Sequence, residues 1–344
     1  MYFLEHYGLF LLNTATIVVA IIVILSVIFT LASRNKTQAK GKIMIKKLNK
    51  HFKELKQTLN QATLSKKAYK QLLKQEKQKN KKETKNDKRN KADKKRVFVL
   101  RFKGDIKASQ VEQLREEITA LLTVATIDDE VVVCLESPGG VVHGYGLAAS
   151  QLKRIRDRKI PLTIAVDKVA ASGGYMMACV ADKIIAAPFA IIGSIGVLLQ
   201  MPNFNKFLEK HNISYEMLTA GEYKRTLTMF GKNTDKGREK MQQELEATQK
   251  LFKNFIEQNR PLVNLQEVAT GEHWFAAQAI EYRLVDVLQT SDDYLLQASN
   301  DTDIYEISKT YKKGLLKKLG HNAQTFFDAT IDKIWQKQQE KNFL

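Results

Sequence analysis

The sequence has few cysteines: Cys134 and Cys179 are the only two in 344 residues, and each lies in a short apolar run. Disulfide frameworks and zinc sites need several cysteines at characteristic spacings. Single thiols among apolar residues are typical of buried, unpaired cysteines. The sequence therefore favours two buried free thiols over a disulfide or a metal pair.

Charge is missing from residues 9–32, a stretch of 24 residues in which only a few side chains are polar. About 20 apolar residues cross a bilayer as a helix. A cleaved signal peptide is the alternative, but it has a shorter apolar run and Lys or Arg before it, and residues 1–8 contain neither. The pattern predicts a short N-terminal segment, residues 1–8, and a retained transmembrane helix over residues 9–32.

Acidic residues are scarce just after this stretch. Residues 34–96 contain 24 Lys or Arg and 5 acidic residues, a net charge of +19 in a chain of +18, so one segment holds the basic character. Residues 77–96 have no aromatic side chains to stack on bases, which argues against nucleic acid and favours anionic lipid as the partner. The basic residues directly after the apolar stretch predict a cytoplasmic location for the rest of the chain.

Apolar residues at spacings of three and four predict one long Lys-rich helix over residues 43–78, with a short coiled coil as an alternative. Residues 77–96, which have almost nothing apolar, are predicted to be a solvated linker, so that residues 33–96 form a basic helix and linker. After it, residues 97–290 alternate β-branched runs with amphipathic helices, which predicts an α/β domain with a mainly parallel sheet. Residues 291–344 are predicted to be a tail with a helix near 322–340.

Eight segments of the predicted domain have clear patterns. Strands are expected at 96–102, 130–136, 161–167, 183–188 and 214–220, and helices at 109–123, 145–158 and 172–181.

A lone serine, Ser172, lies among small residues in "VAASGGYMM". It follows a strand and opens a predicted helix, where unpaired N–H groups and the positive end of the helix dipole favour an alkoxide or an oxyanion. Gly173, without a Cβ, lets a substrate carbonyl approach the backbone. The alternative is that Ser172 only caps the helix in a seam of small residues.

A second glycine patch, "ESPGGVVHG", directly follows the strand at 130–136. Gly139 and Gly140 can point N–H groups into the crevice at the carboxyl end of this strand, the usual ligand position in such sheets. One N–H from this patch and that of Gly173 would form an oxyanion hole.

A nucleophilic serine needs a base, and the sequence offers two candidates. His143 lies in the glycine patch, and Lys224 lies among apolar and small residues in "TAGEYKRTLT". A lysine base must be neutral, and burial lowers the pKa of a lysine. Composition alone does not choose between them.

The motifs "SPGGVVHGYGLAASQL", "VDKVAASGGYMMACVADKI", "GSIGV", "MPNFN" and "YKRTLT" resemble peptidase family S49, the signal peptide peptidase A family. The resemblance extends over nearly the whole chain. It implies a spiral of ββα units of the Clp-protease and crotonase type. It also implies a Ser–Lys dyad: Ser172 as nucleophile, Lys224 as general base and Ser194 as the hydroxyl that orients the lysine. Gly139 and Gly173 would supply the oxyanion N–H groups, and His143 becomes a structural residue.

The same resemblance implies a bacterial inner-membrane serine endopeptidase with one N-terminal anchor and no metal or cofactor. Its substrates would be peptides or unfolded protein, such as signal-peptide remnants. Longer family members draw the serine and the lysine from two domain copies, so this single-copy chain is expected to form a homo-oligomer. The alternatives are a crotonase-like acyl-transfer enzyme and a membrane scaffold without activity. Better-known relatives have a periplasmic domain, whereas the basic residues here favour the cytoplasmic side.

Overall fold

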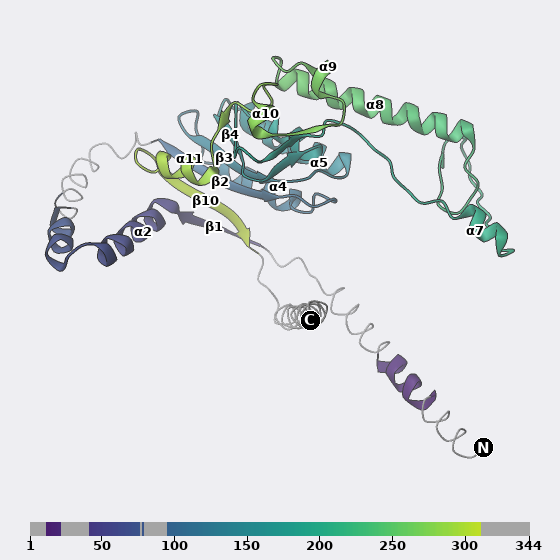
Figure 1. The fold of residues 1–344 in the computed structure, drawn as a ribbon, viewed down its shortest axis with the longest axis horizontal. Helices are drawn as coiled ribbons and strands as arrows, with labels where there is room; N and C mark the ends of the chain where they lie inside the picture. The colour runs from purple at the N-terminus through teal and green to yellow at the C-terminus, as the bar shows by residue number, and fades with distance from the viewer. Residues whose placement is uncertain (1–11, 22–40, 76–77, 79–94, 311–344) are drawn as a thin grey trace, which may run out of the picture. The chain divides into compact units, whose positions relative to one another are not determined.

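The computed structural model of the chain describes residues 12–21, 41–75, 78 and 95–310 (Figure 1). The chain divides into two compact units, residues 43–308 and the two ends of the chain. Residues 12–21, in the second of these, are helical. Across the described ranges, no helix is long and apolar enough to cross a membrane. Most of the predicted transmembrane helix, the centre of the linker and the tail helix at 322–340 lie outside the described residues.

A seven-stranded sheet forms the core of the larger unit, and its strand pairs from β10 to β9 are all parallel, as predicted. Parallel strands are covered on both faces, so they need continuous apolar runs, and Val97 to Leu100 and Val131 to Val133 are fully or almost fully buried. In spatial order the strands are β1 (Lys42–Lys47), β10 (Asp303–Thr310), β2 (Arg96–Lys103), β3 (Glu130–Glu136), β4 (Leu162–Val166), β6 (Lys183–Ala186) and β9 (Val287–Leu288).

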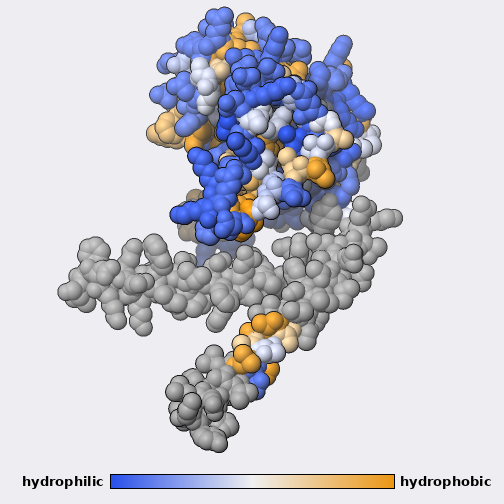
Figure 2. Space-filling view, turned by 90° about the vertical axis from the view of Figure 1, so that its right-hand side faces the viewer, coloured by the Kyte–Doolittle hydropathy of each residue, from blue (hydrophilic) through white to orange (hydrophobic). Residues whose placement is uncertain are grey.

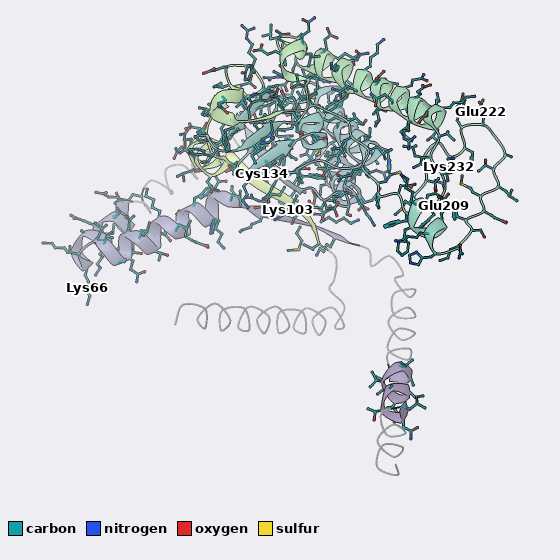
Figure 3. All side chains as sticks on the ribbon, turned by 45° about the vertical axis from the view of Figure 1, so that its right-hand side comes forward. Lys66, Lys103, Cys134, Glu209, Glu222 and Lys232 are labelled. Atoms are coloured by element: carbon teal, nitrogen blue, oxygen red, sulfur yellow. The ribbon has the colours of Figure 1, made fainter. Side chains whose placement is uncertain are left out.

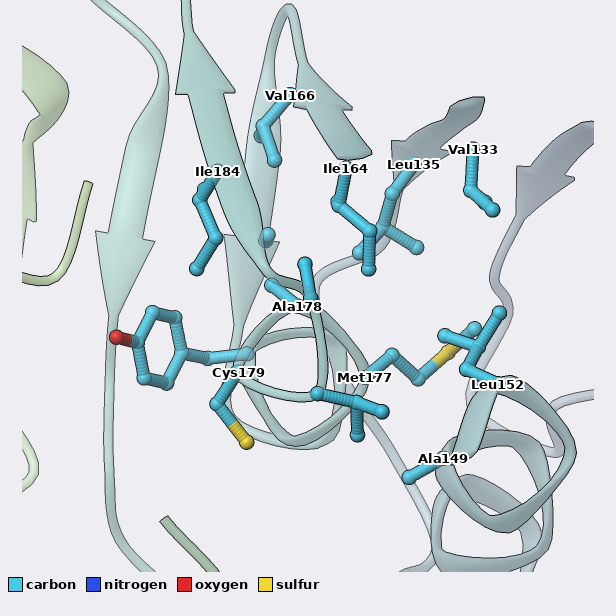
Figure 4. Close-up of a cluster of buried hydrophobic side chains, with 14 of the residues drawn as sticks. Val133, Leu135, Ala149, Leu152, Ile164, Val166, Met177, Ala178, Cys179 and Ile184 are labelled. Carbon is cyan, nitrogen blue, oxygen red and sulfur yellow. The ribbon is translucent and has the colours of Figure 1, made fainter. Parts of the chain in front are cut away.

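Helices cover both faces of this sheet. One face packs against α4 (Val111–Leu121), α5 (Val142–Arg156) and α6 (Gly173–Ala178). Figure 4 shows Leu152 of α5 and Met177 of α6 among the strand side chains of this cluster. The other face holds a smaller apolar cluster that includes residues of α2 (Leu48–Thr63) and α11 (Ser291–Ala298).

A second, three-stranded sheet carries Ser172 and Ser194, each directly after one of its strands. Its strands, in spatial order, are β5 (Val169–Ala171), β7 (Ile191–Gly193) and β8 (His273–Phe275). The β5–β7 pair is parallel and the β7–β8 pair antiparallel. Helices α8 (Asp235–Asn259) and α9 (Leu265–Val268) lie between β7 and β8 in the sequence, and α10 (Ala276–Ala279) directly follows β8.

Residues 197–233, which we call the arm, extend away from the two sheets in Figure 1. Their one named helix is α7 (Asn205–Lys210), and the predicted strand at 214–220 is wrong, because these residues form no strand and all of them are exposed. Apolar side chains of the arm are uncovered, including Leu198 at 80% and Leu218 at 98% exposure. Figure 2, viewed from the arm's side, shows apolar side chains among hydrophilic ones.

The basic segment also differs from the single helix predicted over residues 43–78. Its first residues form β1, which lies beside β10 at the edge of the large sheet. Helix α2 follows and ends at Thr63. A new helical segment begins after Ser65, whose Oγ accepts the N–H of Ala68 over 3.3 Å as an N-cap does.

Candidate functional site

Ser172 occupies the turn between β5 and α6. Its φ of 52° and ψ of −118° lie in a region that L-residues rarely adopt. Although Ser172 has the N-cap position of α6, its side chain makes no capping hydrogen bond. The hydroxyl also has no hydrogen-bond partner elsewhere in the described part of the chain. The N-cap alternative therefore lacks its defining bond, and a strained serine between a strand and a helix is the arrangement of a nucleophile elbow.

The glycine loop, residues 137–141, lies directly against this turn. Gly139 has a φ of +90°, and a Cβ on it would come within 2.8 Å of the Ser172 Cβ and 2.9 Å of the Gly173 nitrogen. The structure thus brings together three residues that the sequence predicted at one site. Glycine at position 139 is required both by the backbone angle and by this close approach.

The N–H groups of the glycine loop have different partners. Gly139 N–H donates to Ser137 Oγ over 3.1 Å, and Val141 N–H donates to the carbonyl of Ile106 over 2.9 Å. Between them, the N–H of the exposed Gly140 has no partner among the described residues, and neither has that of Gly173. The glycine loop and the residue after Ser172 therefore each offer a backbone donor without a partner, Gly140 N–H and Gly173 N–H.

Ser194 lies at the matching end of the neighbouring strand. Ala171 pairs with Gly193 in the β5–β7 register, and the N–H of Ser172 donates to the carbonyl of Gly193 over 2.8 Å. Ser172 and Ser194 are thus the next residues of two paired strands. Ser194 also has a positive φ, 51°, and its N–H donates to the carbonyl of Glu272 over 2.6 Å.

The structure does not join Lys224 to the serines. Lys224 lies in the arm, is exposed, and its side chain makes no hydrogen bond or ion pair with the described residues. Figure 3 labels other residues of the arm, Glu209, Glu222 and Lys232, well away from Cys134 of the large sheet. The expectation of a lysine surrounded by apolar side chains is therefore not met within one chain.

His143, the alternative base, lies in the first turn of α5 and is exposed. It makes no hydrogen bond to Ser172 or to any other described residue. Over the described ranges, no three His, Cys, Asp or Glu side chains converge in a way that would hold a metal ion.

Sequence reasoning missed two residues behind the glycine loop, Ser137 and Tyr145. Both are fully buried, and Ser137 Oγ donates to the Tyr145 hydroxyl over 2.6 Å. One signal was present in the sequence: Tyr145 shares an apolar helix stripe with Ala148, Ala149 and Leu152. A tyrosine on such a stripe buries its hydroxyl, which then requires a partner.

Comparisons with known proteins agree with the sequence motifs. Residues 2–152 match the sequence model "Peptidase family S49 N-terminal", and residues 154–305 match "Peptidase family S49". The chain is 49% identical to "Probable protease SohB" of Haemophilus influenzae over 93% of each chain. It is 48% identical to the protein of that name from Buchnera aphidicola subsp. Acyrthosiphon pisum, over 97% of this chain and 98% of the relative.

Among solved structures, a mutant of the 1510-N membrane-bound stomatin-specific protease with a substrate peptide is 16% identical. It covers 66% of this chain and 98% of its own, with a TM-score of 0.39. The two family matches and the long alignments carry the assignment by themselves. The chain belongs to peptidase family S49.

Proposed function

We propose that the chain is a membrane-anchored serine endopeptidase in which Ser172 attacks the scissile peptide carbonyl. One observation carries the proposal: Ser172 is held at a strained strand-to-helix turn, with its hydroxyl unbonded and with free N–H groups beside it. A serine that served only packing or capping would have no need of this geometry.

In the proposed mechanism, Ser172 Oγ forms a bond to the carbonyl carbon while its proton passes to the neutral amine of Lys224. The tetrahedral intermediate carries its negative charge on the former carbonyl oxygen. When the intermediate collapses, the C–N bond breaks and the leaving amine takes the proton from Lys224. Water then attacks the acyl-enzyme by the same route and releases the second product. Ser194 orients the lysine.

We assign the oxyanion hole to Gly173 and Gly140, which modifies the sequence expectation of Gly173 and Gly139. An oxyanion needs N–H groups that are not engaged elsewhere. The Gly139 N–H is occupied by Ser137 Oγ, whereas the Gly140 and Gly173 N–H groups have no partner among the described residues.

The lysine comes from a neighbouring copy in this proposal. Lys224 is exposed on an arm with uncovered apolar side chains, among them Leu198, Phe207 and Leu218. Exposed apolar clusters on a soluble surface mark interaction sites. A homo-oligomer in which the arm of one protomer covers the site of the next would bury these side chains and bring Lys224 to Ser172.

The remaining parts of the proposal rest on sequence. Residues 9–32 would anchor the protein in the bacterial inner membrane, and the basic segment would lie against anionic lipid with the peptidase domain on the cytoplasmic side. The substrates would be peptides and unfolded segments, including signal-peptide remnants. The domain would have the ββα spiral of the Clp-protease and crotonase type.

Hydrolysis by the full chain in detergent tests the proposal. Casein and a library of quenched fluorescent peptides serve as substrates, and Ser172→Ala is compared with Ser150→Ala, which changes an exposed serine of α5. We expect Ser172→Ala to lose hydrolysis and Ser150→Ala to keep it. Unchanged turnover by Ser172→Ala would refute the proposal.

A further inference from the structure

We infer that the hydroxyls of Ser137 and Tyr145 are positioning groups that hold the glycine loop so that the Gly140 N–H is presented to the oxyanion. The inference rests on the proposed function and adds two residues to the machinery of that site. Neither residue lies in a position to touch the substrate through its side chain, since both are fully buried.

The two hydroxyls form a directed chain of hydrogen bonds. Gly139 N–H donates to Ser137 Oγ over 3.1 Å, and this hydroxyl donates to the Tyr145 hydroxyl over 2.6 Å. Tyr145 in turn donates to the carbonyl of Asp105 over 2.9 Å. Each hydroxyl accepts one bond and donates one, so the chain has a single orientation, and each bond strengthens the next in a buried environment.

The chain of hydrogen bonds ends at Asp105, and the segment that contains Asp105 also holds the other side of Gly140. Asp105 offers its carbonyl to Tyr145, and the next residue, Ile106, offers its own carbonyl to Val141 N–H over 2.9 Å. The N–H groups on either side of Gly140 are therefore fixed to one support. The orientation of the free N–H between them follows from these two bonds.

Neighbouring glycines pack closely against the two hydrogen-bonded side chains, Ser137 and Tyr145. A Cβ on Gly104 would lie 2.3 Å from the Tyr145 hydroxyl and 2.4 Å from Ser137 Oγ. A Cβ on Gly173 would lie 2.4 Å from the Tyr145 ring. Tyr145 thus contacts both oxyanion elements: its ring supports Gly173, and its hydroxyl supports the loop.

Burial raises the pKa of Tyr145 above its ordinary value, although the hydrogen bond from Ser137 opposes this effect. The phenol therefore stays protonated over the working pH range. It can always donate to the Asp105 carbonyl, so the support of the loop does not depend on pH.

The test compares two tyrosine variants of the full chain in detergent. Tyr145→Phe keeps the ring and removes one link of the chain. Tyr175→Phe is the matched control, because Tyr175 is also fully buried and its hydroxyl also donates to a backbone carbonyl, that of Leu284 at 3.2 Å. The readouts are the rate of covalent labelling of Ser172 by a fluorophosphonate, kcat and KM on a cleaved peptide, and the unfolding temperature.

We expect Tyr145→Phe to lower the labelling rate and kcat about tenfold with KM nearly unchanged, which is less than the hundred- to thousand-fold loss on deleting an oxyanion donor. Tyr175→Phe should keep both rates while losing a similar few degrees of stability. Ser137→Ala should match Tyr145→Phe, and the double variant should lose little more, because both break one chain.

The outcomes separate this inference from the proposed function. Absence of labelling at Ser172 in the unaltered chain would refute the proposed function and the inference with it. If Ser172 is labelled, but Tyr145→Phe and Ser137→Ala react as fast as Tyr175→Phe, only the positioning role is refuted. An equal loss in both tyrosine variants would also refute it, since the effect would then be general loosening.

Discussion

The backbone N–H of Ser172 donates to the carbonyl of Gly193 over 2.8 Å and so ties the turn after β5 to the end of β7. This bond holds the serine at a φ of 52°. Its partner strand ends in Gly193 at a φ of 101°, where a Cβ would lie 2.8 Å from the Trp274 ring. The strained turn is thus fixed by a neighbouring strand that is itself fixed by packing.

The strain at Ser172 predicts an unusual order of stability. Glycine accepts a positive φ without a Cβ clash, whereas alanine retains the strain. We expect Ser172→Gly and Ser172→Ala to be equally inactive, with the glycine variant more stable by about 1 kcal/mol. Denaturant unfolding of both variants measures the difference. A more stable alanine variant would show that the turn is not strained.

Gly140 and Gly146 should respond oppositely to replacement by alanine. A Cβ on Gly140 would meet the Ile106 carbonyl oxygen at 2.1 Å, so Gly140→Ala must displace the glycine loop. Gly146, inside α5, has no atom within 4 Å of such a Cβ apart from its neighbours and the backbone of its own helix. We expect Gly140→Ala to lose activity about a hundredfold. Gly146→Ala should keep activity and gain up to about 1 kcal/mol of stability. Equal activity in both variants would contradict the role of the loop.

Lys224→Arg should be as inactive as Lys224→Ala, because an arginine stays protonated at any working pH and cannot act as a base. The expected loss is about a hundredfold or more. Lys232, also exposed in the arm, provides the control, and Lys232→Arg should remain active. A fully active Lys224→Arg would remove Lys224 from the mechanism.

A separate experiment tests whether Lys224 of one chain acts on Ser172 of another. Inactive Ser172→Ala and Lys224→Ala chains, co-expressed with different tags, should recover part of the activity in mixed oligomers, because some interfaces then combine an intact serine with an intact lysine. Co-purification through both tags confirms the mixing. Mixed oligomers that hydrolyse nothing would indicate a dyad built within one chain.

The stability of the folded chain at low pH should depend on Asp129, a buried residue that is hydrogen-bonded to Arg96 at the start of β2. Burial opposes its ionisation, but bonds from Arg96 at 2.6 and 2.8 Å and from Thr126 N–H outweigh this and lower its pKa. A lowered pKa in the folded state means that the stabilisation is complete above the unfolded pKa, about 3.9, and is lost as the pH falls further.

Asp129→Asn should therefore destabilise the chain by about 2 kcal/mol at pH 7, a value reduced by the partial exposure of Arg96. The difference in unfolding free energy between this variant and the unaltered chain should disappear below about pH 4. Asp157→Asn, at an exposed ion pair with Lys153, should leave stability nearly unchanged at either pH. A gap that is the same at pH 7 and pH 3 would show that the Asp129 charge does not matter.

The core strands of the large sheet were predictable because β-branched runs such as Val131 to Val133 have few alternatives to a buried parallel strand. The pairing of β10 with β2 was not predictable. Strand β10, 207 residues after β2 by the Asp303–Arg96 register, adds to the sheet beside it, and no local pattern encodes such a partner. The strand predicted at 214–220 failed for the opposite reason, since these residues lie in the exposed arm and pair with neither sheet.

The site was predictable to a similar degree. Ser172 and the two glycine motifs indicate a strand-to-helix turn and a close backbone approach, and the structure brings them together. Which loop N–H is free depends on the Ser137 and Tyr145 hydroxyls, and these meet only when α5 packs behind β3. In the proposed oligomer, Lys224 reaches Ser172 from a neighbouring chain, and the sequence of one chain gives no pattern from which that geometry could be predicted.

Whether Ser172 is the nucleophile is tested most directly by mapping the residue that a fluorophosphonate modifies. The full chain in detergent is treated with the reagent at pH 8, digested and analysed by mass spectrometry, with the Lys224→Ala variant in parallel. We expect one phosphonylated peptide, containing Ser172, and slow labelling of the variant. An adduct at another serine, or none at Ser172 in a chain that hydrolyses peptides, would contradict it.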